Sequence, residues 1–127
     1  MLKFHIEVSR TSRYCYLTAI SDNTKEHIGK ICIDLDSEDS NRYKSIKNKT
    51  AKIILIWTNE SVCRQGIATA LMNKTIELFK DYLLYLNVIP IRSSVKDKDK
   101  NGLIEFYSKF GFKKYNKDIC VTTMIRK

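Results

Sequence analysis

The sequence lacks any apolar run near the ~20 residues that a membrane-spanning helix needs. It also lacks internal repeats, and its first residues alternate like a strand, without the apolar block and cleavage site of a signal peptide. Its hydrophobic fraction of 43% and charged fraction of 29% are ordinary for a globular protein. These features predict one domain over residues 1–127, located in the cytoplasm and not bound to a membrane.

Closely spaced cysteines are also missing. Cys15, Cys32, Cys63 and Cys120 form no C-x-x-C pair, so neither a zinc site nor a disulfide framework is predicted. We therefore expect reduced thiols and no metal. Cys63 alone precedes a predicted helix, whose N-terminus would favour a thiolate. No histidine lies near it in the sequence, which favours a structural thiol over a nucleophile.

Acidic residues are outnumbered, and the formal net charge is +9. Lysine and arginine clustered on one face would bind an anionic partner such as nucleic acid. The same lysines dispersed over the surface would only keep it solvated. The sequence leaves both interpretations open.

The most informative stretch runs from Ile53 to Leu86. Ile53–Trp57 is continuously apolar and β-branched, which predicts a central strand covered on both faces. A polar turn follows, and apolar residues then recur at helical spacing from Ile67 to Leu86, which predicts a long amphipathic helix. Gly66 stands where this helix begins. It would either bring backbone N–H groups close to a phosphate or allow close packing of the helix on a sheet.

The remaining segments predict a sheet that surrounds this unit. Asn101 or its neighbour is expected to begin a short helix that ends at Gly111. Pro90 argues against full pairing of the strand that contains it. Residues Asp36–Thr50 form a long loop, either a substrate-facing flap or a solvated insertion. The other predicted strands are Leu2–Ser9, Arg13–Ser21, His27–Leu35 with a possible bulge at Gly29, Val88–Val95, and a hairpin of Phe112–Tyr115 and Cys120–Ile125.

Two motifs resemble those of the GNAT superfamily of acetyl-CoA-dependent N-acetyltransferases. The stretch from Cys63 to Leu71 is similar to the family's pyrophosphate-binding pattern Q/R-x-x-G-x-G/A, and the stretch from Phe106 to Phe112 is similar to its F-Y-x-K-x-G-F segment. The resemblance covers residues from Lys52 to the C-terminus. It implies an α+β fold with a mixed, mainly antiparallel sheet of six to seven strands, a central long helix and a short C-terminal helix.

The resemblance also implies how acetyl-CoA would bind. Backbone N–H groups from the helix start would hold its pyrophosphate. Trp57 and Thr58, where the strand is expected to bulge, would pair with the pantetheine arm through their backbone. No metal is implied. The residues at the helix start are Arg64, Gln65, Gly66, Ile67, Ala68 and Thr69.

For catalysis, Tyr107 occupies the position of the family's general acid. With an ordinary pKa of ~10 it could protonate the departing thiolate, whereas without the resemblance it would be a core aromatic. An N–H of the bulge, from Thr58, would stabilise the oxyanion. Glu60, near the strand end, is the first candidate for general base, with a water chain or a role as a helix cap as alternatives.

The sequence departs from the family pattern in three places and in length. Cys63 replaces Gln or Arg, Ala68 replaces the commoner second Gly, and Glu60 stands where Pro is often found. The N-terminal part lacks room for the helical pair that the family inserts after its first strand. The chain therefore resembles a minimal version of the fold, with less wall around the acceptor pocket.

These observations predict an N-acetyltransferase that moves an acetyl group from acetyl-CoA to an amine. The positive charge favours an acceptor on an acidic macromolecule, a protein lysine or N-terminus or an aminoacyl-tRNA, over a cationic small molecule. Related domains often pair, so a homodimer is compatible with the resemblance. The alternative is a non-catalytic module that binds coenzyme A, protein or nucleic acid.

Overall fold

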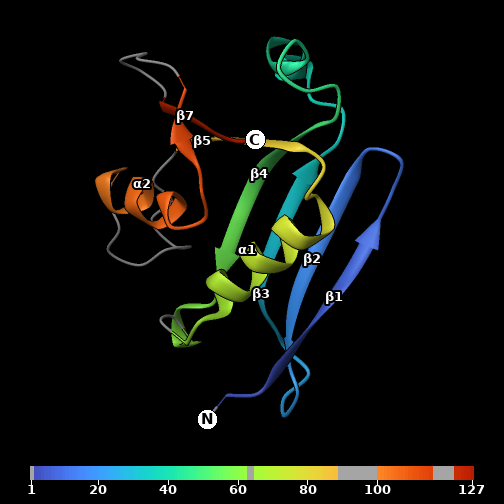
Figure 1. The fold of residues 1–127 in the computed structure, drawn as a ribbon. Helices are drawn as coiled ribbons and strands as arrows, with labels where there is room; N and C mark the ends of the chain where they lie inside the picture. Colours follow the sequence, from blue (N-terminus) through green and yellow to red (C-terminus); the bar gives the residue numbers. More distant parts are fainter. Residues whose placement is uncertain (1, 63–64, 89–99, 116–121) are drawn as a thin grey trace.

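The computed structural model describes residues 2–62, 65–88, 100–115 and 122–127 (Figure 1). The strands are β1 (Phe4–Arg10), β2 (Tyr14–Ser21), β3 (His27–Asp34), β4 (Thr50–Thr58), β5 (Leu83–Val88), β6 (Lys113–Lys114) and β7 (Thr122–Arg126). The helices are α1 (Ile67–Leu78) and α2 (Lys100–Ser108), with short 3-10 helices η1 (Glu38–Tyr43) and η2 (Glu60–Val62).

The described strands form one seven-stranded sheet in the order β1-β2-β3-β4-β5-β7-β6. Every pair of neighbours is antiparallel except β4 and β5, which are parallel. A parallel pair needs a crossover connection, and α1 supplies it. This mixed, mainly antiparallel α+β sheet confirms the predicted fold class.

Helix α1 covers one face of β2, β3 and β4, as Figure 1 shows. Its inner face carries Ile67 and Leu71, both buried in the main hydrophobic core. Gly29 on β3 lies directly beneath them. A Cβ atom at that position would stand 2.7 Å from Ile67 Cγ2 and 3.1 Å from Leu71 Cδ1, so the glycine is needed for close packing of helix and sheet.

The end of the predicted long helix is wrong. Helix α1 ends at Leu78, where the Phe79 N–H makes the last helical bond, to the Thr75 carbonyl, 2.9 Å away. Residues 83–86 belong to β5 and are all buried. Their side chains alternate between the two sheet faces, and both faces are covered at this point. An unbroken apolar run fits such a strand and a buried helix equally well. In the structure these residues pair in parallel with β4 and form a strand.

The loop predicted over Asp36–Thr50 is in fact a packed segment. Tyr43 of η1 is 2% exposed and its ring lies 4.4 Å from that of Tyr85 on β5. The Asp39 carboxylate accepts hydrogen bonds from Ser37 Oγ at 2.7 Å, from Tyr85 OH at 2.7 Å and from Lys52 Nζ at 3.0 Å. These contacts fix η1 against β4 and β5, whereas most residues between η1 and β4 are exposed.

Burial and hydrogen bonding act on Asp39 in opposite directions. Partial burial alone raises the pKa of its carboxyl group, but the three donors stabilise the carboxylate and lower the pKa to about 2. Burial and the bond to the carboxylate raise the pKa of the Tyr85 hydroxyl above its ordinary value. The segment is therefore held by a charge-assisted network as well as by aromatic packing.

The other predicted strands agree with the structure to within about three residues, apart from the strand placed at Val88–Val95, and the largest of these differences is the start of β4 at Thr50 instead of Ile53. That strand, β5, begins five residues earlier, at Leu83. The β2–β3 register shifts opposite Ile28, next to the predicted bulge at Gly29. Residues 89–95 with Pro90, together with Cys63, Arg64 and Cys120, lie outside the described residues. No described helix has the length and apolar character that a membrane crossing requires.

Candidate active site

Strands β4 and β5 pair only along the first four residues of each. The pairing runs from Thr50 with Leu83 to Ile53 with Leu86 and then stops. Beyond Ile53, β4 continues to Thr58 and keeps only its β3 neighbour within the described residues. Figure 1 shows the two strands diverging, with β4 running toward the start of α1. Among the described residues, the second half of β4 therefore presents an open edge.

A β-bulge marks the point of divergence. In the β3–β4 register, Ile33 faces Ile53 and Cys32 faces Leu55, so Ile54 is the extra residue. The bulge predicted at Trp57 and Thr58 is therefore wrong, because both residues are in regular register with β3. A bulge position depends on pairing across strands, which an unbroken apolar run does not reveal.

The bulge changes which residues face the open edge. The Asn59 N–H donates to the Ile28 carbonyl at 2.9 Å, so Asn59 directs its backbone groups toward β3. Backbone direction alternates along a strand, and Trp57 shares the direction of Asn59. Ile56 and Thr58 then direct their N–H and C=O groups toward the open edge. Without the bulge, Leu55 and Trp57 would have done so.

The bulge also arranges the side chains. Ile53 and Ile56 are both buried in the core beneath α1, at a spacing of three residues. Between them, Ile54 and Leu55 are exposed on the opposite face, by 45% and 37%. With strict alternation, residues three apart face opposite sides of a sheet, so either Ile53 or Ile56 would have faced solvent. The core thus fixes the bulge.

At the end of β4 the chain turns through η2 into α1. Gly66 precedes the helix in a left-handed conformation, with φ of 82°, and provides no side-chain cap. The first intrahelical bond is from the Ala70 N–H to the Gly66 carbonyl, at 2.9 Å. The N–H groups of the first helical turn point out of the helix at its positive end. A Cβ atom built on Gly66 meets nothing within 4 Å, so no described atom crowds the turn at this residue.

Several of the predicted site residues lie around the start of α1. Gln65 is exposed, Ile67 is buried beneath the helix, and Ala68 is half-buried while Thr69 is exposed. Glu60 is exposed in η2, two residues after Thr58. The structure thus brings the end of β4, Glu60 and the helix start together. Arg64 lies outside the described residues.

Tyr107 lies on α2, on a separate part of the chain. It is 6% exposed and belongs to the same core as Ile53 and Ile56. Its ring packs edge-on against Phe106 at 5.4 Å and against Phe112 at 6.1 Å. Burial raises the pKa of its hydroxyl to about 12. The group is therefore protonated at neutral pH and can act as a proton donor but not as a base.

Ile56 is the residue that sequence reasoning missed. Its side chain reads as ordinary core, and only the register set by the bulge turns its N–H toward the open edge. In the parts of the chain that the structure describes, no three His, Cys, Asp or Glu side chains gather as metal ligands would. Cys15 and Cys32 are buried free thiols.

The sequence matches the family model described as Acetyltransferase (GNAT) family over residues 2–112. No curated protein sequence matches the chain significantly.

Several solved structures share the fold. PH1933 from Pyrococcus horikoshii OT3 has a TM-score of 0.65 at 23% identity, over 88% of this chain and 64% of its own length. NAA60 of Arabidopsis thaliana, solved in complex with acetyl-CoA, has a TM-score of 0.60 at 18% identity, over 91% of this chain and 76% of that one. Arabidopsis Naa50, solved with the bisubstrate analogue CoA-Ac-MVNAL, has a TM-score of 0.61 at 17% identity, over 88% and 72%.

The chain spans 64% of the length of the Pyrococcus protein. At these identities the structural likeness establishes a common fold, and the family model establishes descent over most of the chain. The chain belongs to the GNAT family of acetyltransferases.

Proposed function

We propose that this protein is an N-acetyltransferase that transfers the acetyl group of acetyl-CoA to an amine on a macromolecule. Membership of the GNAT family agrees with the family predicted from the sequence and supports the predicted acyltransferase class. The single observation that carries the proposal is the open edge of β4, which leads from the bulge at Ile54 to the helix start at Gly66.

The helix start fits the coenzyme's diphosphate. The backbone N–H groups of Ile67, Ala68 and Thr69 would donate to its oxygens, where the helix dipole favours negative charge. Gly66 leaves the approach open because no side chain occupies it. Arg64 and Gln65, which precede Gly66 in the sequence, would add contacts from outside the helix.

The pantetheine arm would lie along the open edge as an extra strand. Ile56 and Thr58 direct their backbone groups to this edge and would pair with its amides. Trp57 directs its backbone toward β3, so we assign it a flanking role through its half-buried side chain. The thioester carbonyl would then reach the Ile56 N–H, which would stabilise its oxygen as negative charge develops.

The chemistry requires two proton transfers. The amine must lose a proton before its nitrogen forms a bond to the thioester carbon, and Glu60 is the carboxylate nearest the end of β4 in sequence. When the carbon–sulfur bond breaks, the thiolate takes a proton. Tyr107 would donate it, because its raised pKa keeps the hydroxyl protonated until the step that needs it.

The acceptor class follows from charge. A net charge of +9 repels polyamines and other cationic small molecules and attracts acidic proteins and tRNA. One neighbour in fold, Naa50, was solved with CoA-Ac-MVNAL, a bisubstrate analogue. We therefore propose a protein amine or an aminoacyl-tRNA as acceptor. A homodimer would supply the wall that the missing helical pair provides elsewhere in the family.

Calorimetric titration with acetyl-CoA, combined with thiol release in the presence of candidate amines, tests this proposal. The panel contains peptides with a free N-terminus, lysine peptides with a blocked N-terminus, aminoacyl-tRNA and spermidine. We expect saturable binding, and turnover with at least one macromolecular acceptor that exceeds turnover with spermidine. Absence of acetyl-CoA binding would refute the proposal.

The burial of Tyr107 favours one other function. The Tyr107 ring is 6% exposed. Its hydroxyl can donate a proton only if the coenzyme sulfur reaches it. If it is not reached, the domain would hold coenzyme A and act by association alone. Tight acetyl-CoA binding with no thiol release from any acceptor would support this non-catalytic module.

A further inference from the structure

A second concave site lies at the other end of the sheet. It is a pocket of about 460 Å³ between β6 and β7, lined by Gly111, Lys113, Lys114, Tyr115, Ile125 and Lys127. This volume falls in the range of small-molecule sites, ~300–1,000 Å³. Nothing in the acetyl-transfer chemistry uses these residues.

The pocket is distinct from the open edge of β4. Ile125 pairs with Tyr85, and Tyr85 pairs with Lys52, all within the half of the sheet where β4 and β5 are still joined. Lys127 follows Arg126, the partner of Leu84 near the beginning of β5. The strands diverge at the opposite end of β5, so a ligand here would not occupy the coenzyme's place.

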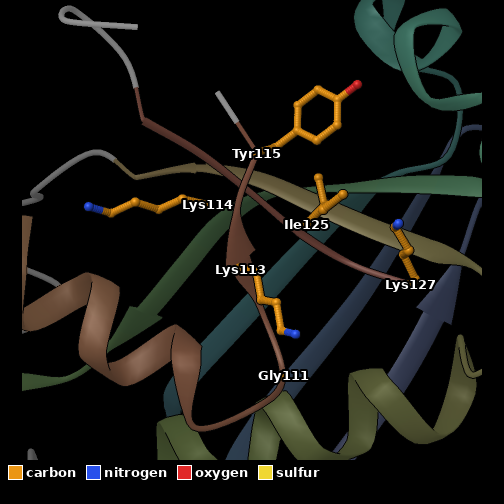
Figure 2. Close-up of a pocket in the computed structure, with 6 residues that line it drawn as sticks. All are labelled: Gly111, Lys113, Lys114, Tyr115, Ile125 and Lys127. Atoms are coloured by element: carbon orange, nitrogen blue, oxygen red, sulfur yellow. The ribbon is translucent and has the colours of Figure 1, made fainter. Parts of the chain in front are cut away.

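Two lysines give this pocket its charge. Lys113 and Lys127 extend from β6 and from the end of β7 near Ile125, while Lys114 extends away from them (Figure 2). Throughout the described ranges, neither Lys113 nor Lys127 forms an ion pair with an Asp or Glu side chain. Uncompensated ammonium groups in a concave site concentrate anions.

An aromatic surface stands beside these charges. The Tyr115 ring is 46% exposed, and the Tyr43 ring packs edge-on against it at 5.2 Å. The Tyr115 N–H also donates to the Thr123 carbonyl at 2.9 Å. Ile125, 7% exposed, forms an apolar floor between ring and lysines. A rigid exposed ring next to cations is a surface on which a planar base can stack.

We propose that this pocket binds a nucleotide, with the phosphate between Lys113 and Lys127 and the base against Tyr115. The nucleotide is either free or one unit of an RNA strand, because both present the same phosphate and planar base. The proposal does not depend on acetyl transfer.

Calorimetry with AMP, adenosine and orthophosphate tests the site directly. AMP should bind more tightly than either of its parts, and its affinity should fall as salt is raised. The double variant Lys113→Ala/Lys127→Ala should weaken AMP binding by about tenfold or more. Tyr115→Ala should weaken AMP binding and leave orthophosphate binding unchanged. Equal affinity for AMP and orthophosphate would overturn the proposal.

A matched control separates a site from general charge. The variant Lys3→Ala/Lys80→Ala removes two exposed lysines elsewhere, and so changes the net charge of +9 by the same amount. It should bind AMP within about twofold of the original protein. An equal loss in both double variants would mean diffuse attraction and would refute the site.

Two further binding measurements identify the source of the ligand and distinguish this pocket from the coenzyme site. Hexa-adenylate RNA that binds about tenfold tighter than AMP through the same lysines would identify a strand, and equal affinities would identify a free nucleotide. Gly66→Ala should weaken acetyl-CoA binding but not AMP binding. AMP binding that is lost in Gly66→Ala and kept in Lys113→Ala/Lys127→Ala would place AMP in the coenzyme site and overturn the proposal.

Discussion

Ile53 is the last residue of β4 that pairs with β5, and its partner is Leu86. On its other side Ile53 pairs with Ile33, immediately before the bulge residue Ile54. At this point β4 therefore loses β5 as a neighbour, and the bulge switches which of its residues direct their backbone groups toward β3. Because both events coincide, the first backbone groups presented to the open edge belong to Ile56.

This relationship predicts a pattern of amide hydrogen exchange along β4. In the free protein, the Ile56 amide should exchange about tenfold or more faster than the amides of Leu55 and Trp57, which face β3. Saturating acetyl-CoA should slow exchange at Ile56 and leave Trp57 nearly unchanged. Residue-resolved exchange by NMR measures both. Protection at Trp57 instead of Ile56 would show that the coenzyme pairs with the other alternate set of backbone groups of β4.

Gly66→Ala should weaken acetyl-CoA binding by about tenfold or more, because a Cβ atom enters the open space before α1. It should also cost ~1–2 kcal/mol of stability, since the position has a positive φ.

Gly111→Ala is the matched control for this change, with φ of 89° at the replaced glycine. It carries similar backbone strain at a residue to which we assign no contact with the coenzyme, so stability should fall while acetyl-CoA affinity is retained. Calorimetry and thermal unfolding measure the two quantities. Equal losses of acetyl-CoA affinity in both variants would show that strain, and not access, controls binding.

Tyr107→Phe should lower kcat by ~10²–10⁴ and leave the KM for acetyl-CoA within about twofold. The ring remains packed against Phe106 and Phe112, so the fold should be retained. Tyr14→Phe, on the far side of the sheet, is the control and should keep full activity.

The pH dependence provides a second test of Tyr107. With a pKa of about 12, its hydroxyl remains protonated through pH 10. The rate should therefore rise with pH as the amine is deprotonated, with no alkaline decline from loss of the acid below that range. A decline centred near pH 9 that disappears in Tyr107→Phe would contradict the structure.

Asp39→Asn should destabilise the protein at neutral pH, by ~1–3 kcal/mol, because a partly buried network of charge-assisted bonds is lost. The folded pKa of about 2 lies below the unfolded value of ~3.9. The stabilisation is therefore present above pH 4 and is lost as pH falls toward 2. Chemical unfolding at pH 7 and pH 2.5 should show a large difference between variant and original protein at the first pH and a small one at the second.

A constant difference between pH 7 and pH 2.5 would mean that packing, and not the carboxylate, holds η1 in place. Tyr85→Phe removes one donor to Asp39 and keeps the ring against Tyr43. It should destabilise the protein less than Asp39→Asn does, because Ser37 and Lys52 still bind the carboxylate.

Several features could be predicted from the sequence because they depend on local pattern. Gly66 before an amphipathic run specified where α1 begins, since a left-handed turn favours glycine. Alternation specified β1 and β2. The extent of β5 could not be predicted, because Leu83 to Leu86 suit a buried strand and a buried helix equally. The packing of Tyr43 and Asp39 onto Tyr85 also depends on residues distant in sequence.

By itself, the sequence determined the order of strands and helices, the family, and the glycine at the helix start, because each depends on residues within a few positions of one another. Only the tertiary structure decided the bulge at Ile54, the divergence of β4 from β5 and the outward N–H of Ile56. These depend on register between strands. Register is set by which side chains the core can bury, and in β4 the core buries Ile53 and Ile56 together.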